Sequence, residues 1–139
     1  MGIEVYINFN GNCREAIEYY AEVFKTERPQ IMTFADGHKE EGTWEIPKEA
    51  ENRVMHTELI ISGSRVMFSD TFPGMDFKPG NNIILTYMTT NPEEIKRIYS
   101  EMKKDGKVGM ELQETFWSKL YGSIIDKFGI EWQFSLENE

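Results

Sequence analysis

The sequence predicts an α+β fold in which the order strand, helix, three strands occurs twice. Two amphipathic helices with N-terminal capping signals predict it, together with the alternating strand that precedes each of them. We expect a single domain over residues 1–139, with a first module at about 1–70 and a second at about 82–139. The two halves share few identical residues, so the repeat rests on the order of the elements.

The first module is predicted from its periodicity and its turn residues. Asn12 and Glu15 have the spacing of a capping box, and apolar side chains then recur every three or four residues. Ser62-Gly63 is typical of a hairpin turn. The expected elements are strand Ile3 to Phe9, helix Cys13 to about Lys25, strand Gln30 to Phe34, a polar loop over 35–52, and strands Arg53 to Ile61 and Ser64 to Asp70.

The second module repeats this pattern after a loop at Thr71 to Asn81. Asn91 is the expected cap of the second helix, Pro92 takes its first position, and Glu94 completes a capping box. The expected elements are strand Asn82 to Thr90, helix Pro92 to Asp105, and strands Val108 to Leu112, Lys119 to Asp126 and Ile130 to Leu136.

Composition excludes several classes of protein. The net charge of −9 opposes binding to nucleic acid, because phosphate contacts need a patch of Lys and Arg. The one cysteine, Cys13, excludes an intrachain disulfide and fits a reducing compartment. The first residues lack the positive charge of a signal peptide, and no apolar run is long enough for a membrane helix. We therefore expect a cytoplasmic protein that binds neither nucleic acid nor membrane.

Three motifs resemble those of one family. They are NFNGNCREAIEYYAEVF at Asn8 to Phe24, MHTELIISGSRVMFSD at Met55 to Asp70, and QETFWSKLYGSIIDKFGIEWQF at Gln113 to Phe134. In this order they are similar to motifs of the PhnB-like branch of the glyoxalase/bleomycin-resistance/extradiol-dioxygenase superfamily, also called the vicinal oxygen chelate superfamily. The resemblance implies two βαβββ modules whose concave sheet faces enclose one cleft. It also implies a homodimer, since relatives with this ending commonly pair and bury sheet edges.

Members of this branch are often labelled demethylubiquinone methyltransferases. This sequence shows no Gly-rich nucleotide-binding loop for S-adenosylmethionine. We therefore expect neither this cofactor nor the methyltransferase activity.

Metal-dependent members of the superfamily hold a divalent ion with His, Glu or Gln from four strands. Carried over by resemblance, these positions fall on Val5, on Phe68 or a neighbour, on Asn82 and on Gln133. Gln133 can ligate and Asn82 is a weak donor, whereas an open divalent site keeps at least three protein ligands. The resemblance therefore predicts that no metal is bound.

His56 and Glu58 are a second candidate, because residues two apart on a strand place both side chains on one face. With His38 from the preceding loop they would form a metal site of two His and one carboxylate. The other interpretations are a general acid–base pair and a solvated or hydrogen-bonded pair, which is the commoner arrangement. Cys13 is expected to be unreactive, because no His or Lys lies close to it in the sequence.

Strand alternation predicts which side chains face the cleft. If Gln133 faces it, Glu131 and Ser135 do so too, and the intervening aromatic residues belong to the core. The other predicted lining residues are Val5, Ile7, Phe68, Ile84 and Thr86, with Trp117 and Tyr121 at the rim. A mostly apolar surface with a few polar groups is typical of a small-molecule pocket.

Two residues outside these sets have structural interpretations. Asp126 is expected to cap the turn at Phe128-Gly129, because Asp commonly accepts from the N–H two residues on. Trp44 in the long polar loop either pins that loop to the surface or covers a pocket.

Two functions of different classes remain. The first is a metal-free protein that shelters an aromatic or amphipathic small molecule. The second is a lyase, isomerase or dioxygenase with a displaced metal site. The small number of metal ligands favours the first.

Overall fold

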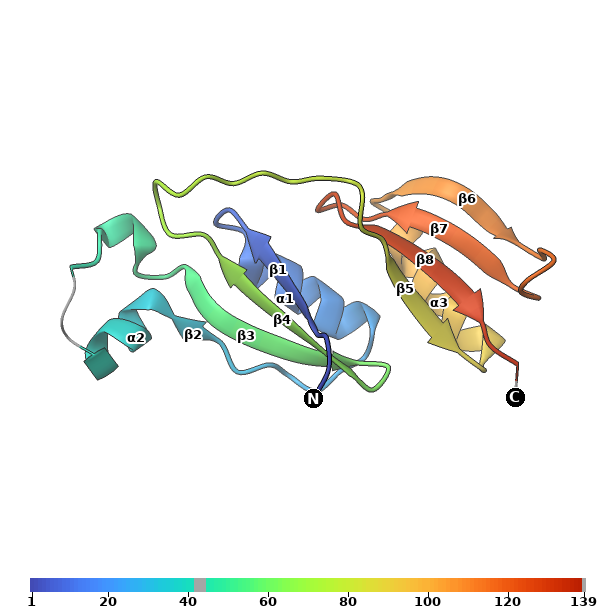
Figure 1. The fold of residues 1–139 in the computed structure, drawn as a ribbon, viewed down its shortest axis with the longest axis horizontal. Helices are drawn as coiled ribbons and strands as arrows, with labels where there is room; N and C mark the ends of the chain where they lie inside the picture. The colour runs from blue at the N-terminus through green and yellow to red at the C-terminus, as the bar shows by residue number, and fades with distance from the viewer. Residues whose placement is uncertain (42–44, 139) are drawn as a thin grey trace. The chain divides into compact units, whose positions relative to one another are not determined.

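The computed structural model describes residues 1–41 and 45–138, and the chain divides into two compact units, Met1–Lys78 and Pro79–Glu139. The first unit contains β1 (Val5–Phe9), α1 (Cys13–Val23), β2 (Met32–Thr33), α2 (Phe34–Glu41), a 3-10 turn (Lys48–Ala50), β3 (Val54–Ile61) and β4 (Ser64–Asp70). The second contains β5 (Leu85–Thr89), α3 (Pro92–Lys103), β6 (Lys107–Gln113), β7 (Tyr121–Ile125) and β8 (Glu131–Leu136) (Figure 1).

Each unit holds one four-stranded sheet, and the two sheets have the same topology. The strand orders are β1-β4-β3-β2 and β5-β8-β7-β6. The β1–β4 and β5–β8 pairs are parallel, and the other pairs are antiparallel. Two βαβββ modules are therefore present, which confirms the predicted α+β fold. Within the described residues, no helix combines the length and apolar character needed to cross a membrane.

The region from 35 to 52, predicted as a loop, is partly helical. Thr33 and Asp36 form a reciprocal cap at the start of α2: the Asp36 N–H donates to Thr33 Oγ1 at 3.1 Å and the Thr33 N–H to Asp36 Oδ2 at 3.0 Å. These hydrogen bonds hold the pKa of Asp36 below its ordinary value. The Thr-x-x-Asp spacing is a sequence signal that the prediction overlooked. Trp44 lies outside the described residues.

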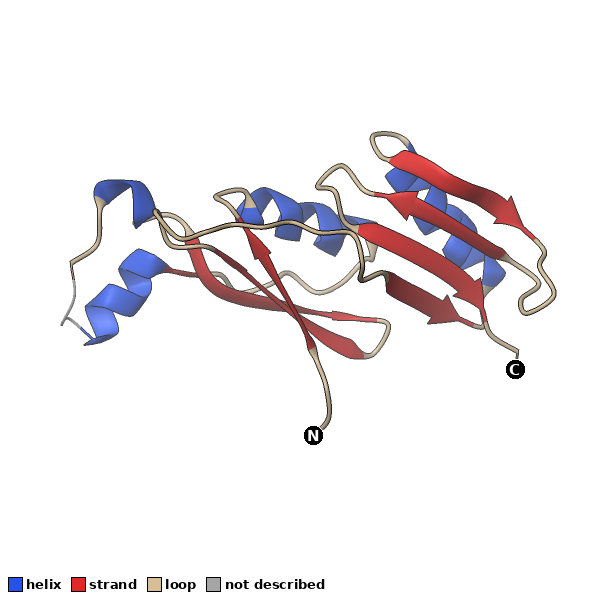
Figure 2. Cartoon of the chain, turned by 45° about the horizontal axis from the view of Figure 1, so that its top comes forward, coloured by secondary structure: helices blue, strands red, loops and turns tan. Residues whose placement is uncertain are grey.

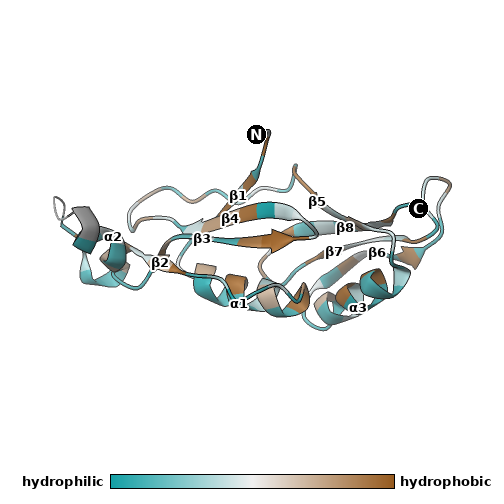
Figure 3. Ribbon diagram, turned by 90° about the horizontal axis from the view of Figure 1, so that it is seen from below, coloured by the Kyte–Doolittle hydropathy of each residue, from teal (hydrophilic) through white to brown (hydrophobic). Residues whose placement is uncertain are grey.

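Each long helix covers one face of its own sheet (Figure 2). The Tyr20 ring of α1 stacks on Phe68 of β4 with centroids 5.9 Å apart, and the Tyr99 ring of α3 meets Phe134 of β8 at the same distance. All four side chains are nearly or fully buried, and full burial of one such apolar side chain contributes roughly 1.5 to 3 kcal/mol. The opposite side of each helix is polar, as the teal parts of α1 and α3 show (Figure 3).

The two aromatic pairs occupy equivalent positions. Tyr20 and Tyr99 each lie seven positions after the first residue of their helix. Phe68 pairs with the third residue of β1, and Phe134 with the third residue of β5. The repeat that the element order predicted is thus also present in the packing of the two cores.

The turn between β1 and α1 is capped by a distant residue. The Asn12 side chain makes no cap hydrogen bond, so the predicted capping box is wrong. Asp70 Oδ1 instead accepts from the N–H groups of Gly11 at 2.7 Å and Cys13 at 3.0 Å, while its Oδ2 accepts from Val54 at 2.9 Å. In the second unit Asn91 does cap α3, accepting from the Glu93 N–H at 3.0 Å, as predicted. The capping box with Glu94 is wrong, because the Asn91 N–H donates to Thr89 and the Glu94 carboxylate accepts from the Tyr87 hydroxyl.

Asp126 caps the turn between β7 and β8, as predicted. Its Oδ1 accepts from the N–H groups of Phe128 at 2.9 Å and Ile130 at 3.0 Å, and its Oδ2 accepts from the Trp132 indole at 2.9 Å. Gly129 takes a φ of 90°, which a side chain would strain. The segment from Asp126 to Trp132 is therefore one hydrogen-bonded turn.

We expect Asp126→Ala to lower the free energy of unfolding by on the order of 3 kcal/mol, because it leaves three donors without their acceptor in a buried place. Urea unfolding measures the change. Asp105→Ala is the control in the same unit, since Asp105 is half-exposed and its ion pair with Lys127 is long, at 3.9 Å. Equal losses in the two variants would contradict the assigned role.

Candidate functional site

The face of the second sheet opposite α3 carries a row of side chains, most of them polar, between two rows of mixed polar and apolar side chains. Met110, Ser123, Gln133 and Thr86 are matched across β6, β7, β8 and β5. Thr86 Oγ1 lies 3.4 Å from Gln133 Oε1. The next row along the strands on one side holds Tyr121, Ser135 and Met88, and the next row on the other side holds Ile125 and Glu131. We call these nine residues the Gln133 face.

An aromatic corner closes one end of the Gln133 face. The Trp117 ring meets the Tyr121 ring at 5.2 Å and 77°, and the Phe116 ring at 4.8 Å and 85°. Trp117 is 53% exposed and Phe116 97% exposed, so their rings are accessible in the second unit. Burial raises the pKa of Tyr121, and the Glu131 carboxylate contributes to the rise.

The face of the first sheet opposite α1 differs in chemistry. Tyr6 and Met67 are paired on β1 and β4, at the positions that Thr86 and Gln133 occupy in the second sheet. The Asn8 side chain, next but one to Tyr6, accepts from Ser69 Oγ at 2.8 Å. A groove of about 850 Å³ runs along the outer edge of β3 and includes His56, Glu58 and Ile60. The two faces therefore share their geometry but not their side chains.

His56 and Glu58 lie on one face, but each has a different neighbour. The His56 ring lies 5.9 Å from the Tyr6 ring, and the Glu58 carboxylate lies 3.5 Å from Arg65. Arg65 also donates two hydrogen bonds to Glu4 and holds the pKa of Glu4 below its ordinary value. Within the described residues no hydrogen bond joins His56 to Glu58. This arrangement gives no support to an acid–base pair.

The prediction that Val5, Ile7 and Phe68 line an open face is wrong. Phe68 is fully buried against α1, and its strand partner Ile7 shares that face, as does Val5 beside Val66. The apolar residues of β1 face the core, so Val5 and Phe68, the metal positions that the resemblance implied in the first module, do not lie on the face opposite α1. The residues of the opposite face that the sequence reasoning missed are Tyr6, Asn8, Met67 and the nearly buried Ser69.

In the second module the predicted phase agrees with the structure. Gln133 lies opposite α3, whereas Trp132 and Phe134 are buried. Ile84 and Asn82 are exposed in the segment before β5. Tyr121 pairs with Ser135, two residues along β8 from Gln133, and the ring of Trp117, which precedes β7, packs on Tyr121.

The described residues contain no group of three or more His, Cys, Asp or Glu side chains that could hold a metal ion. His38 therefore does not form a cluster with His56 and Glu58. The paired positions Tyr6–Met67 and Thr86–Gln133 offer no imidazole or carboxylate. The donor set is poor for the divalent ions that the superfamily resemblance implies.

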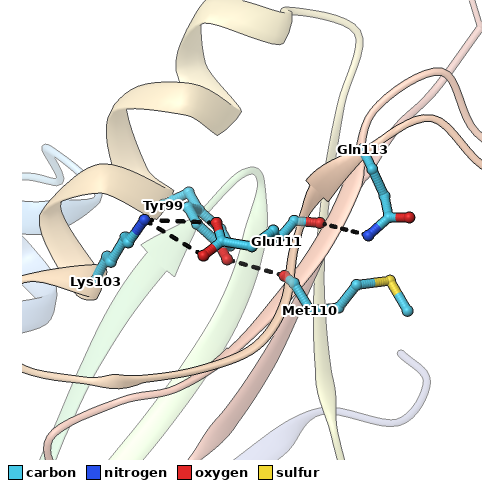
Figure 4. A network of polar contacts seen from close by, with 5 residues as sticks. All are labelled: Tyr99, Lys103, Met110, Glu111 and Gln113. Carbon is cyan, nitrogen blue, oxygen red and sulfur yellow. Dashed lines mark hydrogen bonds and ion pairs between the residues drawn. The ribbon is translucent and has the colours of Figure 1, made fainter.

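A separate polar network lies where α3 meets β6. The Tyr99 hydroxyl donates to the Met110 carbonyl at 2.9 Å, Lys103 lies 3.5 Å from the Glu111 carboxylate, and the Gln113 amide donates to the Glu111 carbonyl at 3.1 Å (Figure 4). Burial raises the pKa of Tyr99 to about 12, and Glu111 contributes. These contacts fasten the helix to the sheet.

Cys13 is no candidate nucleophile. Its side chain is fully buried, and burial, with the Asp70 carboxylate beside it, raises the pKa of the thiol well above the ordinary value. A neutral buried thiol is unreactive. The structure agrees with the expectation from the sequence.

The comparisons with known proteins agree with this architecture. A family model described as 3-demethylubiquinone-9 3-methyltransferase matches residues 2–135. The chain belongs to this family. It lies in the PhnB-like branch of the vicinal oxygen chelate superfamily.

Three relatives are similar over nearly their whole length. Protein YjdN of Escherichia coli strain K12 is 30% identical over 151 residues, covering 98% of this chain and 95% of the relative. The crystal structure of PA1353 from Pseudomonas aeruginosa has a TM-score of 0.82 at 26% identity, covering 100% and 99%. A Bacillus cereus structure, described as a putative 3-demethylubiquinone-9 3-methyltransferase and PhnB protein, has a TM-score of 0.75 at 23% identity, covering 99% and 100%.

The family description implies S-adenosylmethionine, a cofactor that the strand–helix turns of this chain do not fit. Nucleotide cofactors are commonly held by free N–H groups at a Gly-rich turn that opens a helix. In the first unit the Gly11 and Cys13 N–H groups donate to Asp70. In the second, Pro92 has no N–H and the Glu93 N–H donates to Asn91. These two turns therefore offer no cradle for the cofactor.

The raised pKa of Tyr99 predicts a loss of stability at high pH. The unfolded chain releases the phenolic proton at about pH 10, whereas the folded state keeps it up to about pH 12. The free energy of unfolding therefore falls as the pH rises between these two values. Tyr99→Phe should make this alkaline loss smaller, because the variant has no phenol to titrate. Urea unfolding at about pH 9 and 11.5 measures it for both proteins. An unchanged alkaline loss in the variant would contradict the assignment.

Proposed function

We propose that this protein binds a small organic molecule on the Gln133 face without a bound metal ion. The observation that carries the proposal is the row Ser123, Gln133 and Thr86, whose hydroxyl and amide groups lie beside Met88, Ile125 and the aromatic Tyr121. Polar groups that fix orientation beside apolar and aromatic side chains are typical of small-molecule sites. The aromatic corner of Trp117 and Tyr121 adds flat, accessible rings on which a ligand can stack.

The absence of a metal from the proposal is supported by the donor atoms on both sheets. Gln133 is the one good oxygen donor at the four paired positions, and Asn82, the weak donor that the resemblance implied, lies before β5 and is not among them. The positions in the first module hold Tyr6 and Met67. A divalent ion that needs three protein ligands has too few at these positions.

We expect Trp117→Ala to weaken ligand binding by about 1 to 3 kcal/mol, because the ligand loses a stacking ring. A thermal-shift screen of small aromatic compounds finds ligands, and calorimetry then measures affinity. Trp117→Phe is the control and should keep most of the affinity.

Elemental analysis of protein purified without chelators tests the second half of the proposal. Gln133→Ala should leave the metal content unchanged. About one Zn, Ni, Mn or Fe per chain, lost in Gln133→Ala or His56→Ala, would overturn the proposal and favour a metal-dependent lyase, isomerase or dioxygenase.

We also propose that the protein is a cytoplasmic homodimer. The face of the first sheet opposite α1 exposes large side chains, among them Ile60 at 56% and Tyr6 at 48%, and each sheet has two edge strands. Pairing with a second copy would cover such surfaces. The free thiol of Cys13 fits a reducing compartment.

Sedimentation equilibrium at micromolar concentration should give a mass about twice that of one 16.3 kDa chain. The apolar surfaces should make the association persist in high salt, because burial of apolar area does not depend on charge. A mass near that of one chain would count against the homodimer.

A further inference from the structure

Glu131 places a negative charge on the Gln133 face. It pairs with Ile125 at the end of the face away from Trp117, and it is half-buried. Within the described residues it has no ion-pair partner. Its carboxylate contributes to the raised pKa of Tyr121, so its field reaches across the face. A half-buried carboxylate without a cation attracts a positively charged ligand group.

The lysines of the second unit do not cancel this charge. Lys107 is matched with Ile125 and so lies in the same row of this face as Glu131, two strands and roughly 10 Å away at the backbone. It is exposed, and within the described residues it forms no ion pair with Glu131. Lys103 and Lys127 are paired with Glu111 and Asp105. Lys119 is exposed near the aromatic end. The whole chain, with a net charge of −9, adds a negative background.

The Gln133 face thus has an aromatic, a hydrogen-bonding and a charged part, in this order along β7 and β8. Trp117 and Tyr121 lie at one end, the hydrogen-bonding Ser123 and Gln133 in the middle, and Glu131 at the other end. Tyr121 and Glu131 are separated by four residues of the β7–β8 register, about 13 Å at the backbone. Aromatic faces also attract cations.

Building on the proposed function, we propose that the ligand is an organic cation of elongated shape. Its aryl group stacks at Trp117 and Tyr121, a neutral polar linker bonds to Gln133, and its ammonium group lies against Glu131. The order of these three parts of the face, and not the net charge alone, supports this assignment. Organic anions are disfavoured, since their charge would meet Glu131.

Three matched benzamides test the proposal by calorimetry. They share the aryl amide and differ in the chain on nitrogen: 2-(trimethylammonio)ethyl, the neutral isostere 3,3-dimethylbutyl, and 2-carboxyethyl. We expect the cation to bind at least about tenfold more tightly than the neutral compound, and the anion to bind most weakly. Added salt should weaken binding of the cation only.

Glu131→Gln should weaken the cation about tenfold and leave the neutral compound unchanged. Glu111→Gln is the matched control, because it removes the same charge from a residue that is paired with Lys103 and lies outside the face. Its cation affinity should equal that of the unaltered protein. Equal losses in the two variants would overturn the site assignment in favour of a general charge effect.

The outcomes separate this inference from the proposed function. Equal binding of cation and neutral compound, with both weakened by Trp117→Ala, overturns the cation preference and supports the proposed function. Tightest binding of the anion also overturns the preference. No binding of any of the three, at millimolar concentration, counts against both.

Discussion

Two buried carboxylates fix the turns on which both sheets depend. Asp70 lies at the end of β4 and accepts from the N–H groups of Gly11, Cys13 and Val54, so one side chain joins the starts of α1 and β3 to the centre of the sheet. Asp126 does the same for the β7–β8 turn and the Trp132 indole. Both carboxylates are almost fully buried, where unsatisfied donors would be costly.

This role explains what the family motifs encode. Asp70 ends the second motif and caps the helix of the first, which lies 57 residues away. Asp126, Gly129 and Trp132 belong to the third motif, and they form one turn. These motif residues are therefore residues of the architecture. Membership shows the fold, and the chemistry has to be read from the sheet faces.

Local patterns predicted most of the fold and part of the candidate site. Periodicity found α1, α3 and the hairpin of β3 and β4, because each depends on residues close together in the sequence. The Asp70 cap could not be found in this way, since its donors are distant. Phe68 differs for another reason: the resemblance placed it on the cleft face, whereas apolar residues of a half-buried strand face the core, where Phe68 is fully buried. The same rule predicts that Trp132 and Phe134 are buried and that Gln133 lies on the opposite face, as observed.

Cys13 has a consequence for following the motions of the first unit. The thiol is fully buried beside the Asp70 carboxylate and remains protonated, so a thiol-directed alkylating reagent cannot react with it while α1 is in place. Reaction requires α1 to separate from β4. Because this is the one cysteine of the chain, the rate of alkylation measures the rate at which that helix opens locally. The measurement reports on the single Cys13 sulfur atom and needs no introduced label.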